Sequence, residues 1–290
     1  MIATALENNG AIVYIVGRRA EMLEAAAEAR SVRHVAVFGP HTSLLPTLYL
    51  TVLGKQKHGN LIPLQGDVSS KESLKAIADT VKARSGYINL LVNNAGVSLA
   101  IQPKLPTPTT ANGDITQLQQ VLWETETPDS FRKTIDVNVA AVWFGTVAFL
   151  ELLHEGNKRT LAEGGSGVSS QVLTVSSIAS FRKDSNVFSL SYTLSKVAAT
   201  HLGKMMAHYL KEWKIRSNVI CPGLFPSGMP MSSRDISPSL VLMVYTEMVD
   251  ATMSEETKKS LLATIPMGRP GATDDMAGLV LFLASKVRSA

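Results

Sequence analysis

Short apolar runs rich in Val and Ile alternate along this chain with amphipathic stretches, and this alternation constrains the fold more than any other feature. Parallel strands buried on both faces give such runs, and the stretches between them have the length of covering helices. The expected strands are 12–17, 61–65, 89–93, 171–176 and 216–220, and the expected helices are 19–30, 70–84, 128–154, 191–213, 254–263 and 274–285. The pattern predicts a series of β–α–β units, and therefore an α/β fold with a parallel sheet.

The composition is that of a globular protein, since 45% of the 290 residues are hydrophobic and 18% are charged. A disordered chain combines low hydrophobicity with high net charge, so disorder is excluded as the dominant state. The net charge is +4, and the 28 Lys and Arg residues are scattered rather than gathered in one run, so no nucleic-acid partner is expected. Neither a repeat nor a linker divides the chain. We therefore expect one domain over residues 1–290.

Cys221 is the only cysteine. A single thiol excludes an internal disulfide and a multi-cysteine metal site, and it fits a reducing, cytoplasmic compartment. No metal is expected, because the six histidines lack ligand spacing with other donors. The longest apolar run, 137–153, is shorter than the roughly 20 residues that cross a bilayer. No membrane contact is expected either.

Three long stretches interrupt the alternation. Residues 31–59 stand where a helix should pass to the next strand, a connection that usually takes about 2 to 6 residues. Residues 98–127 are typical of a long loop with one short helix, and 224–250 of a flap with one apolar helix. The last two stretches follow the carboxyl ends of strands, where open α/β sheets place their ligands.

Tyr192 and Lys196 stand four residues apart in an expected helix, so both side chains lie on one face, one turn apart. A neighbouring positive charge stabilises a phenolate, so the lysine is expected to lower the pKa of the phenol from its usual value of about 10. The pair predicts a tyrosine that exchanges protons. Taken alone, the spacing also fits a half-buried ring beside a surface amine.

Polar groups follow other expected strands in one consistent order. These groups are Asp67-Val68, Asn93-Asn94-Ala95-Gly96, Val175-Ser176-Ser177 with Ser180, and Cys221-Pro222-Gly223 with Ser227, while Asp136-Val137-Asn138 opens the long apolar helix. Each group alone also fits a turn, a helix cap or a surface hydroxyl. Together they indicate one site.

In this combination the chain resembles the short-chain dehydrogenase/reductase family over about residues 2–285, and in texture its fungal members that serve secondary metabolism. The resemblance implies a Rossmann-type, doubly wound parallel sheet. It implies reversible hydride transfer between a nicotinamide cofactor and a small-molecule carbonyl or alcohol. It also implies a homodimer or homotetramer, with subunit contacts on the helix 128–154 and on the helix after Tyr192.

The resemblance further implies a role for each site residue. Tyr192 would be the general acid/base, and Lys196 would lower its pKa and bind the nicotinamide ribose. Ser177, preferred to Ser176, would hydrogen-bond the substrate carbonyl, and Asn138 would hold a water in the proton relay. Cofactor binding would also involve Asp67 and Val68 at the adenine, Asn93, Ala95 and Gly96 on the adenosine side, and Pro222, Gly223 and Ser227 at the nicotinamide.

The identity of the cofactor follows from the end of the strand 12–17, where Arg18 and Arg19 stand and no acid does. In dinucleotide-binding folds an acid at this position binds the ribose 2′-hydroxyl, whereas arginine accommodates a 2′-phosphate. Guanidinium groups suit bidentate phosphate contacts. We therefore expect NADP(H). The alternative is that the two arginines only begin a solvated helix.

The expected elements lack the first strand of the family with its glycine-rich turn, and its last edge strand. Residues 1–9 resemble the tail of the helix that follows that turn, and 276–285 resemble the last helix. The first strand is central in the usual order 3-2-1-4-5-6. Its absence is expected to leave two neighbouring strands unpaired, with low stability and weak cofactor binding.

Residues 32–56 are expected to be an atypical insertion. Val32-Arg33 can be encoded by GTAAGA and Gln56 by CAG, which have the form of splice sites, so a retained intron is one explanation. The other is that a strand-like segment, 34–38 or 48–53, fills the central position. That arrangement would require unusual threading of the connections.

Two functions remain open from the sequence. The first is an NADP-dependent ketone reductase or alcohol dehydrogenase for an apolar compound, because the flap offers an adaptable lining of Leu, Phe and Met. The second is a catalytically silent remnant that dimerises or senses the cofactor. The missing strands favour the remnant, and the intact set of Asn138, Ser177, Tyr192 and Lys196 opposes it.

Overall fold

The computed structural model describes residues 1–28, 59–100, 103–162, 168–183, 189–225 and 265–285. All five expected strands are present, with bounds that differ from the expected ones by at most one residue. They are β1 (Val13–Gly17), β2 (Leu61–Gln65), β3 (Leu90–Asn93), β4 (Gln171–Val175) and β5 (Arg216–Ile220). Each hydrogen-bonded pair of strands is parallel, which confirms the predicted α/β class.

The helices alternate with these strands as predicted. They are α1 (Ile2–Glu7), α2 (Ala20–Glu28), α4 (Lys71–Ser85), α5 (Ile115–Thr125), α6 (Pro128–Ile135), α7 (Ala141–Ala148), α8 (Leu150–Ala162), α9 (Leu190–Leu210) and α12 (Thr273–Ala284). The insertion 32–56, the expected helix 254–263 and most of the flap, Ser227 included, lie outside the described residues.

The apolar helix expected over 128–154 is broken into three. α6 passes into a π-helical segment, Asp136–Ala140, then α7 follows, and α8 begins only after Phe149, where the axis turns by 49°. The sequence predicted the element but not the breaks, because 137–153 is an almost continuous apolar run, in which a shift of the helical phase leaves no visible mark. No single helix among the described residues is long and apolar enough to cross a bilayer. Only Pro128–Ala148 and Leu150–Arg159, taken together across their bend, have the length and hydropathy of a membrane span.

The strands form two sheets rather than one. β1 pairs with β2, while β3, β4 and β5 form a three-stranded sheet with β4 in the middle. Parallel ladders alternate in direction, so the amides of Tyr14 and Val16 in β1, and of Leu90 and Val92 in β3, point away from their partner strands. The described residues contribute no strand between these two edges. The absence of a central strand stays a prediction, because residues 29–58 lie outside the described residues.

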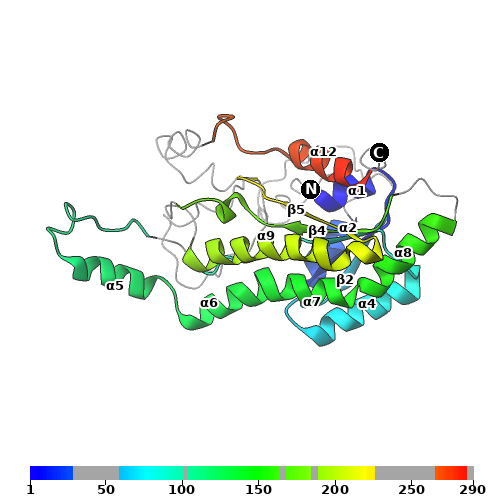
Figure 1. The fold of residues 1–290 in the computed structure, drawn as a ribbon, viewed down its shortest axis with the longest axis horizontal. Helices are drawn as coiled ribbons and strands as arrows, with labels where there is room; N and C mark the ends of the chain where they lie inside the picture. Colours follow the sequence, from blue (N-terminus) through cyan, green and yellow to red (C-terminus); the bar gives the residue numbers. More distant parts are fainter. Residues whose placement is uncertain (29–58, 101–102, 163–167, 184–188, 226–264, 286–290) are drawn as a thin grey trace, which may run out of the picture.

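Helices cover both faces of the strands (Figure 1). On one face α4, α7, α8 and α9 pack in two apolar clusters, and one of these brings Tyr14 of β1 and Leu91 of β3 against the same helical side chains. On the other face α1 and α12 pack together over the three-stranded sheet, through Ile2, Leu173 and Val280 among others. The two sheets therefore share an apolar core although they are not hydrogen-bonded to each other.

The position of α9 is fixed at its start and along its length. The hydroxyl of Ser189 caps the helix by accepting the N–H of Tyr192 at 3.2 Å. Farther along, Gly203 allows close approach to β5, since a Cβ there would lie 2.2 Å from Cγ2 of Val219. The first turn of α9 is thereby held beside the carboxyl ends of β4 and β5.

Candidate active site

Tyr192 and Lys196 lie one turn apart on α9 and are both buried, with 6% and 3% of their surfaces exposed. The Lys196 ammonium lies 5.7 Å from the centroid of the Tyr192 ring. Its Nζ donates a hydrogen bond to the carbonyl oxygen of Val175, the last residue of β4, at 3.0 Å. The two side chains therefore occupy one compartment, at the carboxyl end of β4, the middle strand of the three-stranded sheet.

Ser177 follows β4 and faces Tyr192. Its hydroxyl is hydrogen-bonded to the phenol and also accepts the N–H of Ala179 at 3.1 Å, at the start of a 3₁₀ turn, Ile178–Ser180. Ser176 points elsewhere, because its hydroxyl bonds the carbonyl oxygen of Lys196 and the hydroxyl of Thr200. The geometry thus separates the two serines as the sequence analysis did.

Asn138 lies in the π-helical segment and is 1% exposed. Its Nδ2 donates to the carbonyl oxygen of Val97 at 2.9 Å and to the hydroxyl of Ser195 at 2.8 Å, and its Oδ1 accepts the N–H of Val97 at 2.8 Å. Both side-chain donors are thus committed to protein groups. A water of the expected relay would have to use the second lone pair of Oδ1 or a main-chain group.

The loop after β3 passes close to both side chains. At Gly96 a Cβ would lie 3.3 Å from Nζ of Lys196 and 3.4 Å from Oδ1 of Asn138, so any larger residue would crowd them. The neighbouring Ala95 is exposed at the same strand end. The amide of Asn93 donates to the hydroxyl of Thr146 of α7 at 3.0 Å and so joins the helix to the strand, and its expected place beside the adenosine stays a prediction.

The electrostatics of the pair differ from expectation as well. Burial raises the pKa of Tyr192, while the hydrogen bond from Ser177 acts in the opposite direction. Burial lowers the pKa of Lys196 to about 8, and the charge of Cys221 partly opposes that shift. The expected net lowering of the phenol pKa is not seen, because burial raises the pKa of Tyr192 more than the hydrogen bond from Ser177 lowers it, and the ammonium lies over the ring and donates to Val175.

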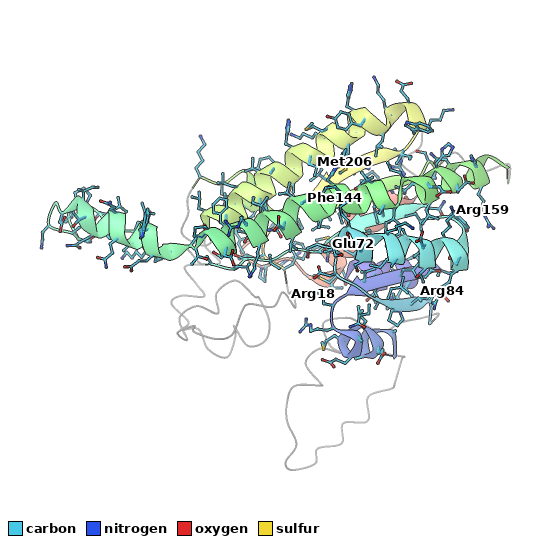
Figure 2. The ribbon with its side chains drawn as sticks, turned by 90° about the horizontal axis from the view of Figure 1, so that it is seen from below. Arg18, Glu72, Arg84, Phe144, Arg159 and Met206 are labelled. Carbon is cyan, nitrogen blue, oxygen red and sulfur yellow. The ribbon has the colours of Figure 1, made fainter. Side chains whose placement is uncertain are left out.

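Asp67 and Val68, expected at the adenine, follow β2 of the other sheet. The carboxylate of Asp67 accepts the N–H and hydroxyl of Ser69 at 2.9 and 2.6 Å and so forms a turn before α4, whose cap is Ser70, and Val68 is half-buried beside it. This hydrogen bonding lowers the pKa of Asp67, and the charge of Arg18 contributes in the same direction. Arg18 and Arg19 are exposed after β1, and Figure 2 shows Arg18 near Glu72 and well apart from Met206 of α9.

The segment after β5 lies beside Ser177. The carbonyl oxygen of Pro222 accepts the N–H of Ile178 at 2.9 Å, and a Cβ on Gly223 would be 3.9 Å from the side chain of Ile178. Two shallow hollows of the described surface, of about 410 and 400 Å³, lie away from this group, one on α5 and one beside Lys214. Neither is lined by a residue expected in the site.

Two buried serines of α9 escaped the sequence analysis. Ser195 joins Asn138 to the helix, because its hydroxyl donates to the carbonyl oxygen of Tyr192 at 2.7 Å and accepts from Asn138. Ser191 bonds the carboxylate of Glu126. Ser195 could have been found from its place three residues after Tyr192 on one helical face, whereas nothing local signals the partner of Ser191.

Comparison with known proteins gives three kinds of match. A family model described as short chain dehydrogenase matches residues 47–237. The chain is 38% identical over 290 residues to the short-chain dehydrogenase/reductase PhomF′ of Diaporthe leptostromiformis, a match that covers 99% of this chain and 80% of that protein. It is 34% identical over 300 residues to the short-chain dehydrogenase/reductase VdtF of Byssochlamys spectabilis, with coverage of 99% and 82%.

Among solved structures, the Pseudomonas aeruginosa RhlG/NADP active-site complex superposes with a TM-score of 0.66 at 23% identity, covering 99% of this chain and 85% of that one. At this identity the likeness concerns the fold alone. The predicted resemblance to fungal members is confirmed by the sequence relatives. The parallel sheets with helices on both faces, the order of polar groups after the strands and these matches agree: the chain belongs to the short-chain dehydrogenase/reductase family.

Proposed function

We propose that this oxidoreductase interconverts a ketone and a secondary alcohol on an apolar small molecule, with NADP(H) as cofactor and Tyr192 as general acid/base. The observation that carries the proposal is the compartment at the end of β4, where Tyr192 and Lys196 are buried together and the hydroxyl of Ser177 is bonded to the phenol. Besides α9 and the residues after β4, the loop after β3 and the π-helical segment contribute to this arrangement, through Gly96 and Asn138. A silent remnant would have no need to keep their groups in register.

In the reductive direction Tyr192 donates its phenolic proton to the oxygen of the substrate carbonyl, which Ser177 also binds. Bound NADPH supplies the hydride that the carbonyl carbon receives. Because burial raises the pKa of Tyr192, the phenol is protonated at neutral pH and ready to donate. The Lys196 ammonium, charged below its pKa of about 8, stabilises the phenolate left behind until solvent returns the proton.

The residues present fit the cofactor at two points. The buried ammonium of Lys196 has three N–H groups and gives one of them to Val175, so donors remain for ribose hydroxyls. Arg18 and Arg19 are exposed at the end of β1, with no acid in their place, and suit a 2′-phosphate. The Pseudomonas protein described as an NADP complex supports the same choice. The other proposed contacts of the cofactor are Asp67, Val68, Asn93, Ala95, Gly96, Pro222, Gly223 and Ser227.

The substrate is proposed to be apolar, of the kind that fungal enzymes of secondary metabolism reduce. Leu224 and Phe225 begin the flap beside Gly223, and the ring of Phe225 packs so closely on Gly271 that a Cβ there would lie 2.3 Å from it. These side chains bring apolar surface next to the segment that bonds Ile178. An apolar ketone fits such a wall better than a charged sugar phosphate.

The deciding experiment follows NADPH oxidation with acetone, cyclohexanone and α-tetralone, for the wild type and for Tyr192→Phe. Removal of the proton donor should lower kcat about a thousandfold on every active ketone. Tyr209→Phe is the matched control, because Tyr209 lies on the same helix but is 51% exposed. Equal rates for Tyr192→Phe and the wild type would refute the assignment.

A homodimer or homotetramer in the cytoplasm completes the proposal. α6, α7 and α9 run side by side (Figures 1 and 2), and their outer face exposes large apolar side chains, among them Phe144, Val147, Leu194 and Val197. Apolar patches of this kind mark subunit contacts. Val197→Glu should produce monomers in sedimentation analysis, and cell fractionation tests the location.

A further inference from the structure

An arm of the chain extends between β3 and α6. Its described part, 103–125, ends in α5, which projects from the body in Figure 1 and has no buried residue. The hydrogen bonds given for its side chains stay within the arm, as in the pairing of Thr107 with Thr110 and of Thr116 with Asp114. Among the described residues, its first hydrogen bonds to the body come at Glu126, the residue that ends α5.

Glu126 is hydrogen-bonded to the first turn of α9 through both of its carboxylate oxygens. One carboxylate oxygen accepts the hydroxyl of Ser191 at 2.5 Å, and the other accepts the N–H of the same residue at 3.1 Å. Ser191 is fully buried and directly precedes Tyr192. A carboxylate at this place also stabilises the N-terminus of the 21-residue helix α9, because the first N–H groups of a helix carry partial positive charge.

Glu126 is equally close to the start of α6. The next residue, Thr127, caps α6 through a reciprocal pair of hydrogen bonds with Ser130. α6 leads directly into the π-helical segment that carries Asn138, and it packs along α9. One half-buried side chain therefore fixes the relative position of the two helices that carry Asn138 and Tyr192.

We propose that Glu126 is a positioning residue, which holds the first turn of α9 so that the phenol of Tyr192 stays aligned with Ser177. This inference rests on the proposed function of Tyr192. Loss of the carboxylate would leave the helix-end N–H of Ser191 without its partner and would leave the buried hydroxyl with only the hydroxyl of Ser189, 3.2 Å away, so the first turn would loosen. The chemistry would suffer, while the contact of Arg18 and Arg19 with a 2′-phosphate, on the other sheet, would not.

The kinetic test compares Glu126→Ala and Glu126→Gln with the wild type, on α-tetralone and NADPH. Glu126→Ala should lower kcat about tenfold, because small displacements of a reacting group are costly, and should change the KM for NADPH by a smaller factor, because the arginines proposed for the 2′-phosphate lie on the other sheet. Glu126→Gln should restore most of kcat, because an amide can accept the N–H with its oxygen and donate to the hydroxyl with its nitrogen. Glu124→Ala is the control. It removes the same charge two residues earlier, where the carboxylate only bonds Gln120 of its own helix.

The structural test needs no turnover. Amide hydrogen exchange of the full chain should accelerate about tenfold over 190–196 in Glu126→Ala but not in Glu124→Ala. Ser191→Ala should show a smaller change, and the double variant should be no worse than Glu126→Ala, since the two residues act as one unit. If Glu126→Ala does not fold, the Gln and Ser191 variants give the same readouts.

The outcomes separate this inference from the proposed function. Wild-type kcat and wild-type exchange in Glu126→Ala, beside an inactive Tyr192→Phe, would overturn the positioning role alone. Full activity in Tyr192→Phe would overturn the proposed function, whatever the exchange of α9 shows.

Discussion

The two sheets of the molecule differ in how their polar side chains are held. Around the three-stranded sheet, Asn138, Ser177, Ser195 and Lys196 are buried and hydrogen-bonded to groups on other segments. Around the two-stranded sheet, Arg18 is exposed and the Asp67 carboxylate bonds only its own turn. The groups proposed for proton transfer are thus held in place by the described fold, whereas the arginines proposed for the 2′-phosphate lie on its surface and are not enclosed.

The strands explain this difference. β4 has a hydrogen-bonded neighbour on each side, and Val172, Leu173 and Thr174 are almost fully buried. Among the described strands β1 has one neighbour, and none of its residues is fully buried. A side chain that follows β4 is thus fixed by packing on both sides, and one that follows β1 is fixed by its own turn.

Replacing the buried ammonium of Lys196 should produce the largest effect on activity. It should affect only the groups around the three-stranded sheet. Lys196→Met should lower kcat about a thousandfold, because the phenolate formed at Tyr192 loses its compensating charge. Lys204→Met, an exposed lysine of the same helix, serves as the control. NADPH oxidation is the measurement, and a Lys196→Met enzyme with wild-type kcat would remove the distinction between the sheets.

Hydrogen exchange compares the two sheets without any substrate. The amide of Leu173 in β4 should exchange at least about a hundredfold more slowly than those of Tyr14 and Val16, which point away from β2. Exchange followed by NMR resolves the individual amides. Strong protection of Tyr14 and Val16 would mean that β1 has a second neighbour in solution.

The nucleotide side has its own test. Arg18→Ala should raise the KM for NADPH about tenfold and leave that for NADH unchanged, since one charge-assisted contact to a 2′-phosphate is lost. kcat should not change, because the compartment of Tyr192 lies on the other sheet. Arg84→Ala, at the exposed end of α4, is the control, and an equal effect on both cofactors would argue against a phosphate contact at Arg18.

The smallest expected effect concerns stability and pH. Burial lowers the pKa of Lys196 from 10.5 to about 8 in the folded protein. Between those values the unfolded chain binds the proton and the folded chain does not, so this group makes stability rise with pH from about 8 to 10.5. The difference in Tm, wild type minus Lys196→Met, should therefore be a few degrees larger at pH 9.5 than at pH 7.5. A constant difference would indicate an ordinary pKa for Lys196.

Much of the fold could be predicted from the sequence because its signals are local. Runs such as Val13–Gly17 and Gln171–Val175 announce buried strands by composition, and the spacing of Tyr192 and Lys196 places them on one helical face. The pKa of Tyr192 could not be predicted, because it depends on burial and on where the ammonium points. The bond between Glu126 and Ser191 joins residues 65 positions apart, and no local pattern reports such a pair.

The widened turn at Asp136–Ala140 has a consequence for how the two ends of this region face. A π turn holds one residue more than an α turn, so it rotates everything after it by about 100° relative to an uninterrupted helix. That rotation brings Thr146 round to Asn93 and places Phe144 on the outside. Deletion of Val137 would restore a regular screw and turn the outer apolar face of α7 toward the strands. The extra residue thus allows one helical region to direct Asn138 into the proposed site and the apolar side chains of α7 to the surface.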